Sequence, residues 1–282
     1  MPATLTDGGH SRTLSTIFQA LELPILVNPV TLIGRTTLNA INTAGTLTLF
    51  LGEALGQLVK RPMYFRLFLR QCELVGVNSL PIVLLTAIFT GGVLALQSFR
   101  GFDNATIAAE SVGTVVALSM LRELGPVLAS LMVAGRVGAS MAAEIGTMRV
   151  TEQIDALVTL ATNPMKYLVL PRILALAVMM PLLAILANVV GIFGGYLVAT
   201  KSLGLNAYTY IDKSFASVQF ADITLGLVKA FVFGIIIALM GCYHGYTTRG
   251  GAEGVGRATT TAVVYASVMI LVTDYLLTAL MF

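Results

Sequence analysis

The chain has 282 residues, of which 56% are hydrophobic and only 11% are charged, and its mean hydropathy is +0.87. A soluble domain carries about a quarter charged residues, so this composition excludes an ordinary soluble protein. The net charge of +3 is small, and the basic residues form no patch interleaved with aromatic residues, which excludes nucleic-acid binding. The long apolar runs predict an all-α integral membrane protein.

The N-terminal region, residues 1–60, is expected to lie in the membrane interface. Residues 11–23 place apolar side chains at i, i+3, i+4 and i+7, which is typical of a short interfacial helix. Residues 31–59 are long enough to span, but one side carries several Asn and Thr residues and Glu53. An interfacial or partly embedded helix is therefore favoured there over a full span.

The second region, residues 61–282, contains five stronger candidate spans. They are expected at residues 79–98, 110–136, 171–200, 222–246 and 258–281. With the N-terminus inside, twelve Lys and Arg residues fall on the cytoplasmic side, against Arg100, Lys201 and Lys213 outside. By the positive-inside rule, the N-terminus is cytoplasmic and the C-terminus periplasmic in a multi-pass inner-membrane protein.

The longest cytoplasmic connection between spans contains residues 144–157, which carry four charges. Ile145, Met148, Glu152 and Asp155 are spaced to share one face of a short helix. Such a helix can be a plain surface connector, or it can be a coupling helix that docks on a motor subunit. The residues alone do not choose between these two interpretations.

A second polar group lies inside the second predicted span, in the run that begins Arg122-Glu123 and ends at Pro126. A charge within a span costs at least about 2.5 kcal/mol, so it usually faces a cavity or a partner group. One interpretation is an internal salt bridge between Glu123 and Lys229 of the fourth span. The other is the polar floor of a lipid cavity, where Arg122 or Lys229 meets a phosphate. The two interpretations are compatible.

The outward end of the first span contains Leu94, Phe99 and Phe102. These side chains are candidates to line the mouth of an acyl-chain cavity, but the residues alone favour plain contact with bilayer lipid. Glycines spaced four apart, as at Gly191 and Gly195, predict close packing between helices.

The sequence contains no motif for catalysis. It has no His-Glu-x-x-His, no paired intramembrane aspartates and no Gly-Lys-Ser/Thr phosphate loop. Cys72 and Cys242 are far apart and have no further ligands at metal-binding spacing. No catalytic residue, metal or cofactor is therefore expected in this chain.

Several motifs resemble the MlaE (YrbE) family of lipid ABC transporter permeases. They are LRELGPVLASLMVAGRVGAS (121–140), EIGTMRVTEQIDAL (144–157), PRILA (171–175), GRATTTAVV near 256–264 and DYLLTALMF (274–282). They occur in the family's order and together cover most of residues 60–282. The resemblance implies an N-terminal interfacial helix followed by about five transmembrane helices.

The resemblance also implies how such a chain works. Members form homodimers with a cytoplasmic ATPase that binds ATP and Mg, a periplasmic MCE-domain hexamer and often a STAS-domain subunit. They move phospholipids between the inner membrane and the outer envelope, which maintains outer-membrane lipid asymmetry. The family's RELGP glutamate, here Glu123, lies in the lipid pocket between the two permeases. The alternative function is a membrane scaffold for an envelope lipid-binding complex that does not itself transport.

By the same resemblance, the coupling helix lies near residues 144–160. The residues expected to dock on the ATPase are Glu144, Gly146, Thr147, Met148, Arg149, Glu152, Gln153 and Asp155.

Overall fold

The computed structural model describes residues 29–58, 64–102 and 104–281. The chain divides into two compact units, Met1–Leu49 and Phe50–Phe282, and each is described by itself. Throughout the described residues every regular element is a helix, so the predicted all-α fold is confirmed. The helix predicted at 11–23 lies outside the described residues.

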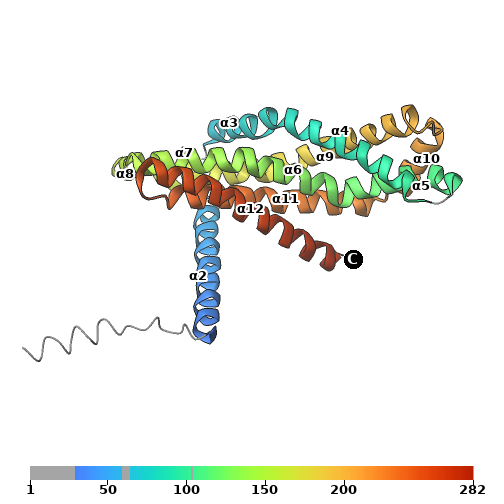
Figure 1. Ribbon diagram of the computed structural model, residues 1–282. Helices are drawn as coiled ribbons and strands as arrows, with labels where there is room; N and C mark the ends of the chain where they lie inside the picture. Colours follow the sequence, from blue (N-terminus) through green and yellow to red (C-terminus); the bar gives the residue numbers. More distant parts are fainter. Residues whose placement is uncertain (1–28, 59–63, 103, 282) are drawn as a thin grey trace, which may run out of the picture. The chain divides into compact units, whose positions relative to one another are not determined.

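The helices follow one another with short connections (Figure 1). In chain order they are α2 (Pro29–Gly56), α3 (Phe65–Gly76), η1 (Val77–Ser79), α4 (Leu80–Arg100), α5 (Ala105–Ser119), η2 (Met120–Leu124), α6 (Gly125–Val133), η3 (Ala134–Gly138), α7 (Ala139–Val150), α8 (Gln153–Thr159), η4 (Met165–Val169), α9 (Leu170–Lys201), α10 (Ala207–Ser217), α11 (Phe220–Tyr246) and α12 (Gly251–Met281). The segments η2, η3 and η4 are π-helical turns that continue the helices beside them.

All five predicted spans are confirmed, and each is longer than predicted. The described helices that are long and apolar enough to cross a membrane are Phe65–Arg100, Thr106–Val150, Met165–Lys201, Phe220–Tyr246 and Gly251–Met281. The sequence pattern had underestimated them because the polar ends of these helices continue beyond the apolar core. In Figure 1 the spans run side by side, with α8 at one end of the bundle and α5 and α10 at the other.

The ambiguous segment at residues 31–59 forms the helix α2, Pro29–Gly56. This helix is not among the five candidate spans of the described residues. The predicted helix is therefore confirmed, and its location in the membrane interface stays a prediction.

Close backbone contacts hold α4 against α9. A Cβ atom added at Gly91 would lie 1.8 Å from the Gly191 carbonyl oxygen, and one added at Gly194 would lie 2.2 Å from the Ile88 carbonyl oxygen. Only glycine allows this approach, and in lipid such close packing is a main source of helix association. The packing role predicted for Gly191 is confirmed, while Gly91 had not been singled out.

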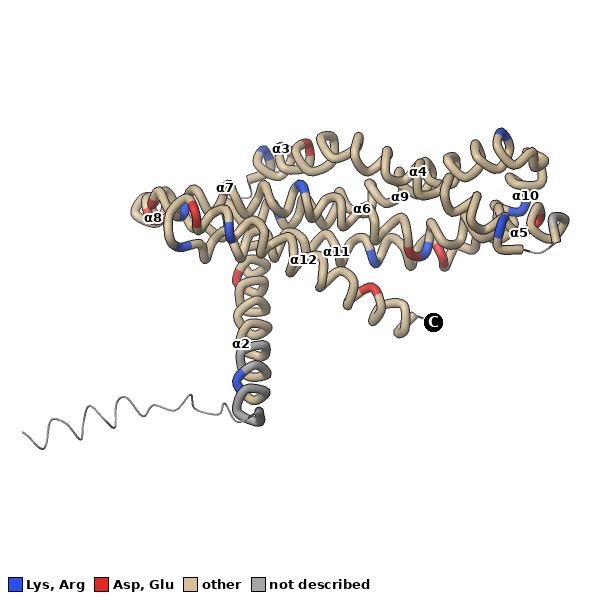
Figure 2. Tube along the Cα trace, viewed as in Figure 1, with Lys and Arg blue, Asp and Glu red and all other residues tan. Residues whose placement is uncertain are grey.

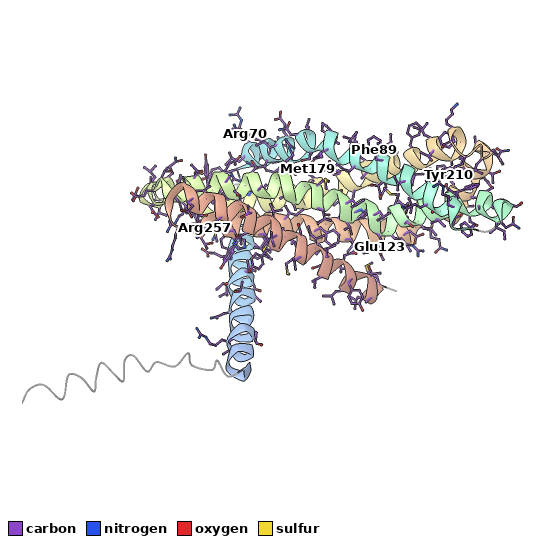
Figure 3. All side chains as sticks on the ribbon, in the orientation of Figure 1. Arg70, Phe89, Glu123, Met179, Tyr210 and Arg257 are labelled. Atoms are coloured by element: carbon purple, nitrogen blue, oxygen red, sulfur yellow. The ribbon has the colours of Figure 1, made fainter. Side chains whose placement is uncertain are left out.

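The short helix α10 is attached to α9 through a buried tyrosine. Tyr210 is 2% exposed, its hydroxyl donates a hydrogen bond to the Ile192 carbonyl at 3.2 Å, and its ring packs edge-on against Tyr196. Burial raises the pKa of Tyr210 above its ordinary value because water no longer stabilises the phenolate. Figure 3 shows Tyr210 at the end of the bundle opposite α8.

Candidate functional site

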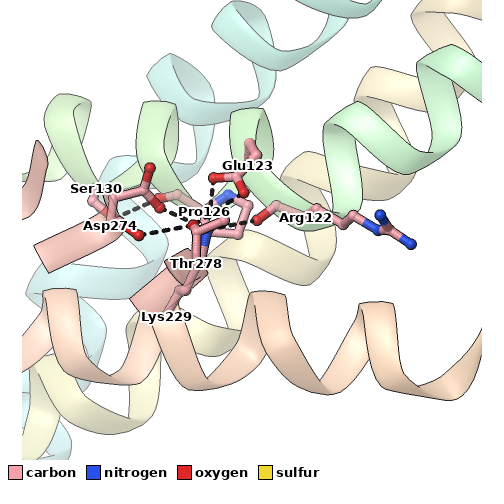
Figure 4. A network of polar contacts seen from close by, with 7 residues as sticks. All are labelled: Arg122, Glu123, Pro126, Ser130, Lys229, Asp274 and Thr278. Atoms are coloured by element: carbon pink, nitrogen blue, oxygen red, sulfur yellow. Dashed lines mark hydrogen bonds and ion pairs between the residues drawn. The ribbon is translucent and has the colours of Figure 1, made fainter. Parts of the chain in front are cut away.

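A charged network lies inside the helix bundle, centred on Lys229 of α11 (Figure 4). The Lys229 side chain is fully buried, and its Nζ lies 2.6 Å from Oε2 of Glu123 and 2.8 Å from Oδ1 of Asp274. Nζ also donates to the Thr278 hydroxyl at 2.7 Å. The network therefore joins three helical segments that are far apart in sequence, η2, α11 and α12.

The backbone of η2 supplies a further acceptor, and Pro126 explains why it is available. A proline within a helix lacks the N–H that would bond the carbonyl four residues earlier, here that of Arg122. Lys229 Nζ donates to this Arg122 carbonyl at 3.2 Å. The π-helical turn at Met120–Leu124 is a local widening of the kind common at functional sites. The RELGP motif thus presents both a carboxylate and a main-chain oxygen to the buried lysine.

A second ion pair extends the network towards the start of α11. Arg122 Nε donates to Asp222 Oδ1 at 2.7 Å, and Asp222 Oδ2 accepts from the backbone N–H of Gln219 at 2.9 Å. Asp222 also belongs to the capping box that begins α11, an arrangement that satisfies otherwise unpaired helix N–H groups. The Asp222 carboxylate therefore caps the N-terminus of α11 and also orients Arg122.

The predicted salt bridge between Glu123 and Lys229 is confirmed. The predicted contact of Lys229 with a phosphate is not supported, because its ammonium group is enclosed by Glu123, Asp274, Thr278 and the Arg122 carbonyl. The accessible members are Arg122, whose side chain is 34% exposed, and Glu123, at 37%. These two side chains are the most exposed of the charged groups in the network, and their contact with a lipid stays a prediction.

The apolar residues predicted to line the cavity mouth lie elsewhere, at the end of α4 and in the turn that follows. Leu94 and Phe99 are half-buried, and Phe102 is 37% exposed. Their predicted place at the mouth of an acyl-chain cavity stays a prediction.

The predicted coupling segment is two helices, and its prediction as a single short helix was wrong. Helix α7 continues the second span to Val150, and Glu152 then adopts a left-handed conformation, with φ 59°, before α8 begins at Gln153. This conformation ends an α-helix and is unfavourable for a residue with a Cβ. A break of this kind has no signal in hydrophobic spacing, and it separates Ile145 and Met148 from the face that carries Asp155.

The eight predicted docking residues fall into two groups. Glu144, Gly146, Thr147, Met148 and Arg149 belong to α7, whereas Glu152, Gln153 and Asp155 form the turn and the start of α8. Within α7, Gly146 is buried, and Glu144 pairs with Arg172 of α9 at 2.8 Å. Gly146 is therefore not available for docking, whereas the Glu144 side chain is still 51% exposed, and its docking role stays a prediction.

Most of the exposed members gather around the α7–α8 turn. Thr147, Glu152, Gln153 and Asp155 are exposed there, and Glu144 is exposed further back on α7. Arg149 Nη1 donates to Asp155 Oδ1 at 2.8 Å across the turn, and its guanidinium lies 5.8 Å from the centre of the Tyr246 ring. The turn is therefore a compact, charged projection between two spans.

Several residues of these two regions were missed by sequence reasoning. Asp222, Asp274 and Thr278 belong to the charged network, and Asp274 carried a usable signal as a charge inside the last apolar run. At the α8 end, Val158 is 56% exposed and Leu160 is 74% exposed. Sequence analysis did not single out Val158 and Leu160 as exposed, because apolar residues are also common in the neighbouring spans.

No group of three or more His, Cys, Asp or Glu side chains capable of holding a metal is present among the described residues. The fold and the site define an all-α, multi-pass membrane protein whose charged groups lie inside the bundle and at one inter-helix turn.

Comparison with known proteins identifies the family. Residues 68–280 match the Permease MlaE family, and the chain belongs to it. It is 50% identical to a probable ABC transporter permease protein of Rickettsia typhi over 258 residues, which cover 92% of this chain and 99% of the relative. It is therefore the permease component of an ABC transporter and a multi-pass inner-membrane protein.

Two further relatives have more specific names. The intermembrane phospholipid transport system permease protein MlaE of Haemophilus influenzae is 36% identical over 92% of this chain and 99% of its own length. The chloroplastic protein TRIGALACTOSYLDIACYLGLYCEROL 1 of Arabidopsis thaliana is 37% identical over 82% of this chain and 66% of its own length. The family assignment suggested by the RELGP and EIGT motifs is thus confirmed.

Proposed function

We propose that this chain moves phospholipids between the inner membrane and the outer envelope, using ATP hydrolysed by a separate ATPase subunit. It works as a homodimer, with the lipid cavity between the two copies, and its N-terminus lies in the cytoplasm. A periplasmic MCE-domain hexamer and a STAS-domain subunit complete the assembly. The relative from H. influenzae, named for intermembrane phospholipid transport, supports this choice of substrate.

One structural observation carries the mechanism. The second span is a continuous helical segment from Thr106 to Val150 that contains Glu123 and ends at the α7–α8 turn. A displacement of the turn is therefore transmitted along one continuous helical segment to the charged network. Because π-helical turns leave backbone hydrogen bonds irregular, η2 and η3 are places where this segment can bend.

In this mechanism the ATPase binds the α7–α8 turn and contacts Glu152, Gln153 and Asp155. Closure of the ATPase dimer displaces the turn and shifts η2 relative to α11 and α12. The partly exposed Arg122 and Glu123 side chains then move against the lipid headgroup, while Lys229 stays paired with Asp274 of α12. This chain binds no ATP, and it converts the movement of its partner into a change of access to the cavity.

The decisive experiment is purification of the tagged full chain from native membranes in mild detergent. Co-purifying proteins are identified and bound lipids are measured by mass spectrometry. We expect an ABC ATPase, an MCE-domain protein and phospholipid at a fixed ratio to the chain. Isolation of the chain with an MCE-domain protein but without any ATPase, in several detergents, would contradict the proposal and favour the non-transporting scaffold.

A further inference from the structure

A cavity with charged side chains in its lining lies between α3, α7 and α9. Figure 1 shows the positions of these helices in the bundle. The cavity consists of two adjoining hollows of about 210 and 280 Å³, which share Gln71, Leu74 and Glu144 in their linings. Arg136 lines the smaller hollow and Arg172 the larger. None of these arginines belongs to the Lys229 network.

The charge of this cavity is strongly positive. Among the described residues that line it, Arg70, Arg136 and Arg172 are basic, whereas Glu144 is the only acidic one. Glu144 pairs with Arg172 at 2.8 Å. The ion pairs between described residues include neither Arg70 nor Arg136, so two positive charges lack a compensating carboxylate there.

Arg172 has a hydrogen-bond donor that the described residues leave without an acceptor. The residue is 6% exposed, its Nη2 donates to Glu144 Oε2, and its Nη1 donates to the Leu168 carbonyl, both at 2.8 Å. Its Nε–H is buried and has no acceptor among the described residues. Buried donors are nearly always paired, so the described residues leave the Arg172 guanidinium only partly satisfied.

The depth of the cavity agrees with a phosphate group at the membrane surface. The span Met165–Lys201 has 37 residues and is about 55 Å long at 1.5 Å per residue, whereas the hydrocarbon core of a bilayer is about 30 Å thick. Arg172 lies only about 10 Å along the helix from Met165. It is therefore near the edge of the hydrocarbon, where lipid phosphates lie.

We propose that this cavity binds a phosphate-bearing anion, with Arg172 as the inner ligand and Arg136 and Arg70 at the rim. Guanidinium groups present paired N–H donors that match phosphate oxygens, and Figure 3 shows Arg70 extending outward from α3. Along the second span, Glu144 is about 30 Å from Glu123. The cavity is thus separate from the Lys229 network, and its ligand binding does not depend on transport.

Two sources supply this chemistry: the headgroup of an anionic phospholipid and free phosphate. The first probe is phosphatidylglycerol in phosphatidylcholine nanodiscs that contain the full chain, with bound lipid counted by native mass spectrometry. The second probe is inorganic phosphate, titrated by calorimetry into the same nanodiscs. The variants are Arg136→Gln and Arg70→Gln, both at exposed positions. Arg136→Gln also removes the hydrogen bond that Arg136 Nη1 donates to the buried Ser79 hydroxyl at 3.0 Å, so its folding is checked by thermal unfolding. Arg66→Gln is the matched control, because Arg66 is exposed on the same helix and does not line the cavity.

We expect Arg136→Gln to weaken binding of one of the two probes about tenfold, because the variant loses one charge-assisted hydrogen bond to the anion. Arg70→Gln should weaken it less, and Arg66→Gln should leave it unchanged. Glu144→Gln should strengthen binding, because it removes the carboxylate that competes for Arg172, whereas general damage to the fold would weaken it. The probe that responds identifies the source. Equal binding of both probes by the wild type, Arg136→Gln and Arg66→Gln would overturn the proposal.

Discussion

The Lys229 network and the α7–α8 turn contain ion pairs of nearly the same length in very different surroundings. Lys229 Nζ lies 2.6 Å from Glu123 and 2.8 Å from Asp274, with the lysine fully buried. Arg149 lies 2.8 Å from Asp155, with side chains that are 37% and 61% exposed. Figure 2 shows the two groups of charges in separate parts of the bundle.

This comparison shows that burial, and not distance, decides what a charged pair does. Water and ions screen the exposed pair, whose contribution to stability is at most about 1 kcal/mol. Removing one partner of a buried pair leaves an uncompensated charge and costs about 3 to 5 kcal/mol. The network is therefore expected to hold the helices together, and the turn to be available for a partner.

The largest effect is expected for Lys229→Met. The change leaves the carboxylates of Glu123 and Asp274 close together without their cation, and the free energy of unfolding should fall by about 3 to 5 kcal/mol. The measurement is thermal unfolding of the purified chain in detergent. Lys213→Met is the control, since Lys213 is exposed on α10. Similar losses in both variants would contradict the distinction between buried and exposed charges.

A smaller loss is expected for Glu123→Gln. Asp274 still compensates Lys229 in this variant, and the glutamine can accept the Lys229 hydrogen bond, so stability should fall by about 1.5 kcal/mol, the lower end for a charge-assisted hydrogen bond. Transport should fall further than stability, because Glu123 is one of the two most exposed charged groups of the network. The check is to measure lipid transfer and thermal unfolding on the same preparation. Normal transfer would exclude Glu123 from the lipid path.

At the turn, the double change Glu152→Lys and Asp155→Lys is expected to separate stability from activity. Stability should change by at most about 1 kcal/mol, because both side chains are exposed. ATPase co-purification and lipid transfer should be lost, since the charge of the docking surface is reversed. A double variant that still retains the ATPase and transports lipid would favour the scaffold. Glu253→Lys, at an exposed position of α12, is the matched control.

The smallest effect is expected for Glu152→Gly. Glu152 has φ 59°, a conformation that is unfavourable for non-glycine residues by about 1 to 2 kcal/mol, and the flexibility of glycine in the unfolded chain offsets part of the gain. Stability should rise by less than about 1 kcal/mol, measured as a small increase in Tm. A decrease in Tm would show that contacts of the Glu152 side chain outweigh the backbone strain.

Composition and apolar runs determined the membrane class, and local motifs determined the family. Five spans were predictable because lipid requires long apolar helices with internally satisfied backbones, and this requirement acts on each segment separately. The pair Glu123–Lys229 was predictable for a related reason. An isolated charge in a span needs a partner, and few residues at similar depth can supply one.

Only the tertiary structure decided how these parts combine. It brought Asp274 and Thr278 of the last helix to Lys229, paired Glu144 of α7 with Arg172 of α9, and divided the coupling segment at Glu152. Each of these depends on contacts between distant segments or on one backbone angle. Neither leaves a periodic trace in sequence, because apolar spacing reports which face of a helix is buried and not what that face meets.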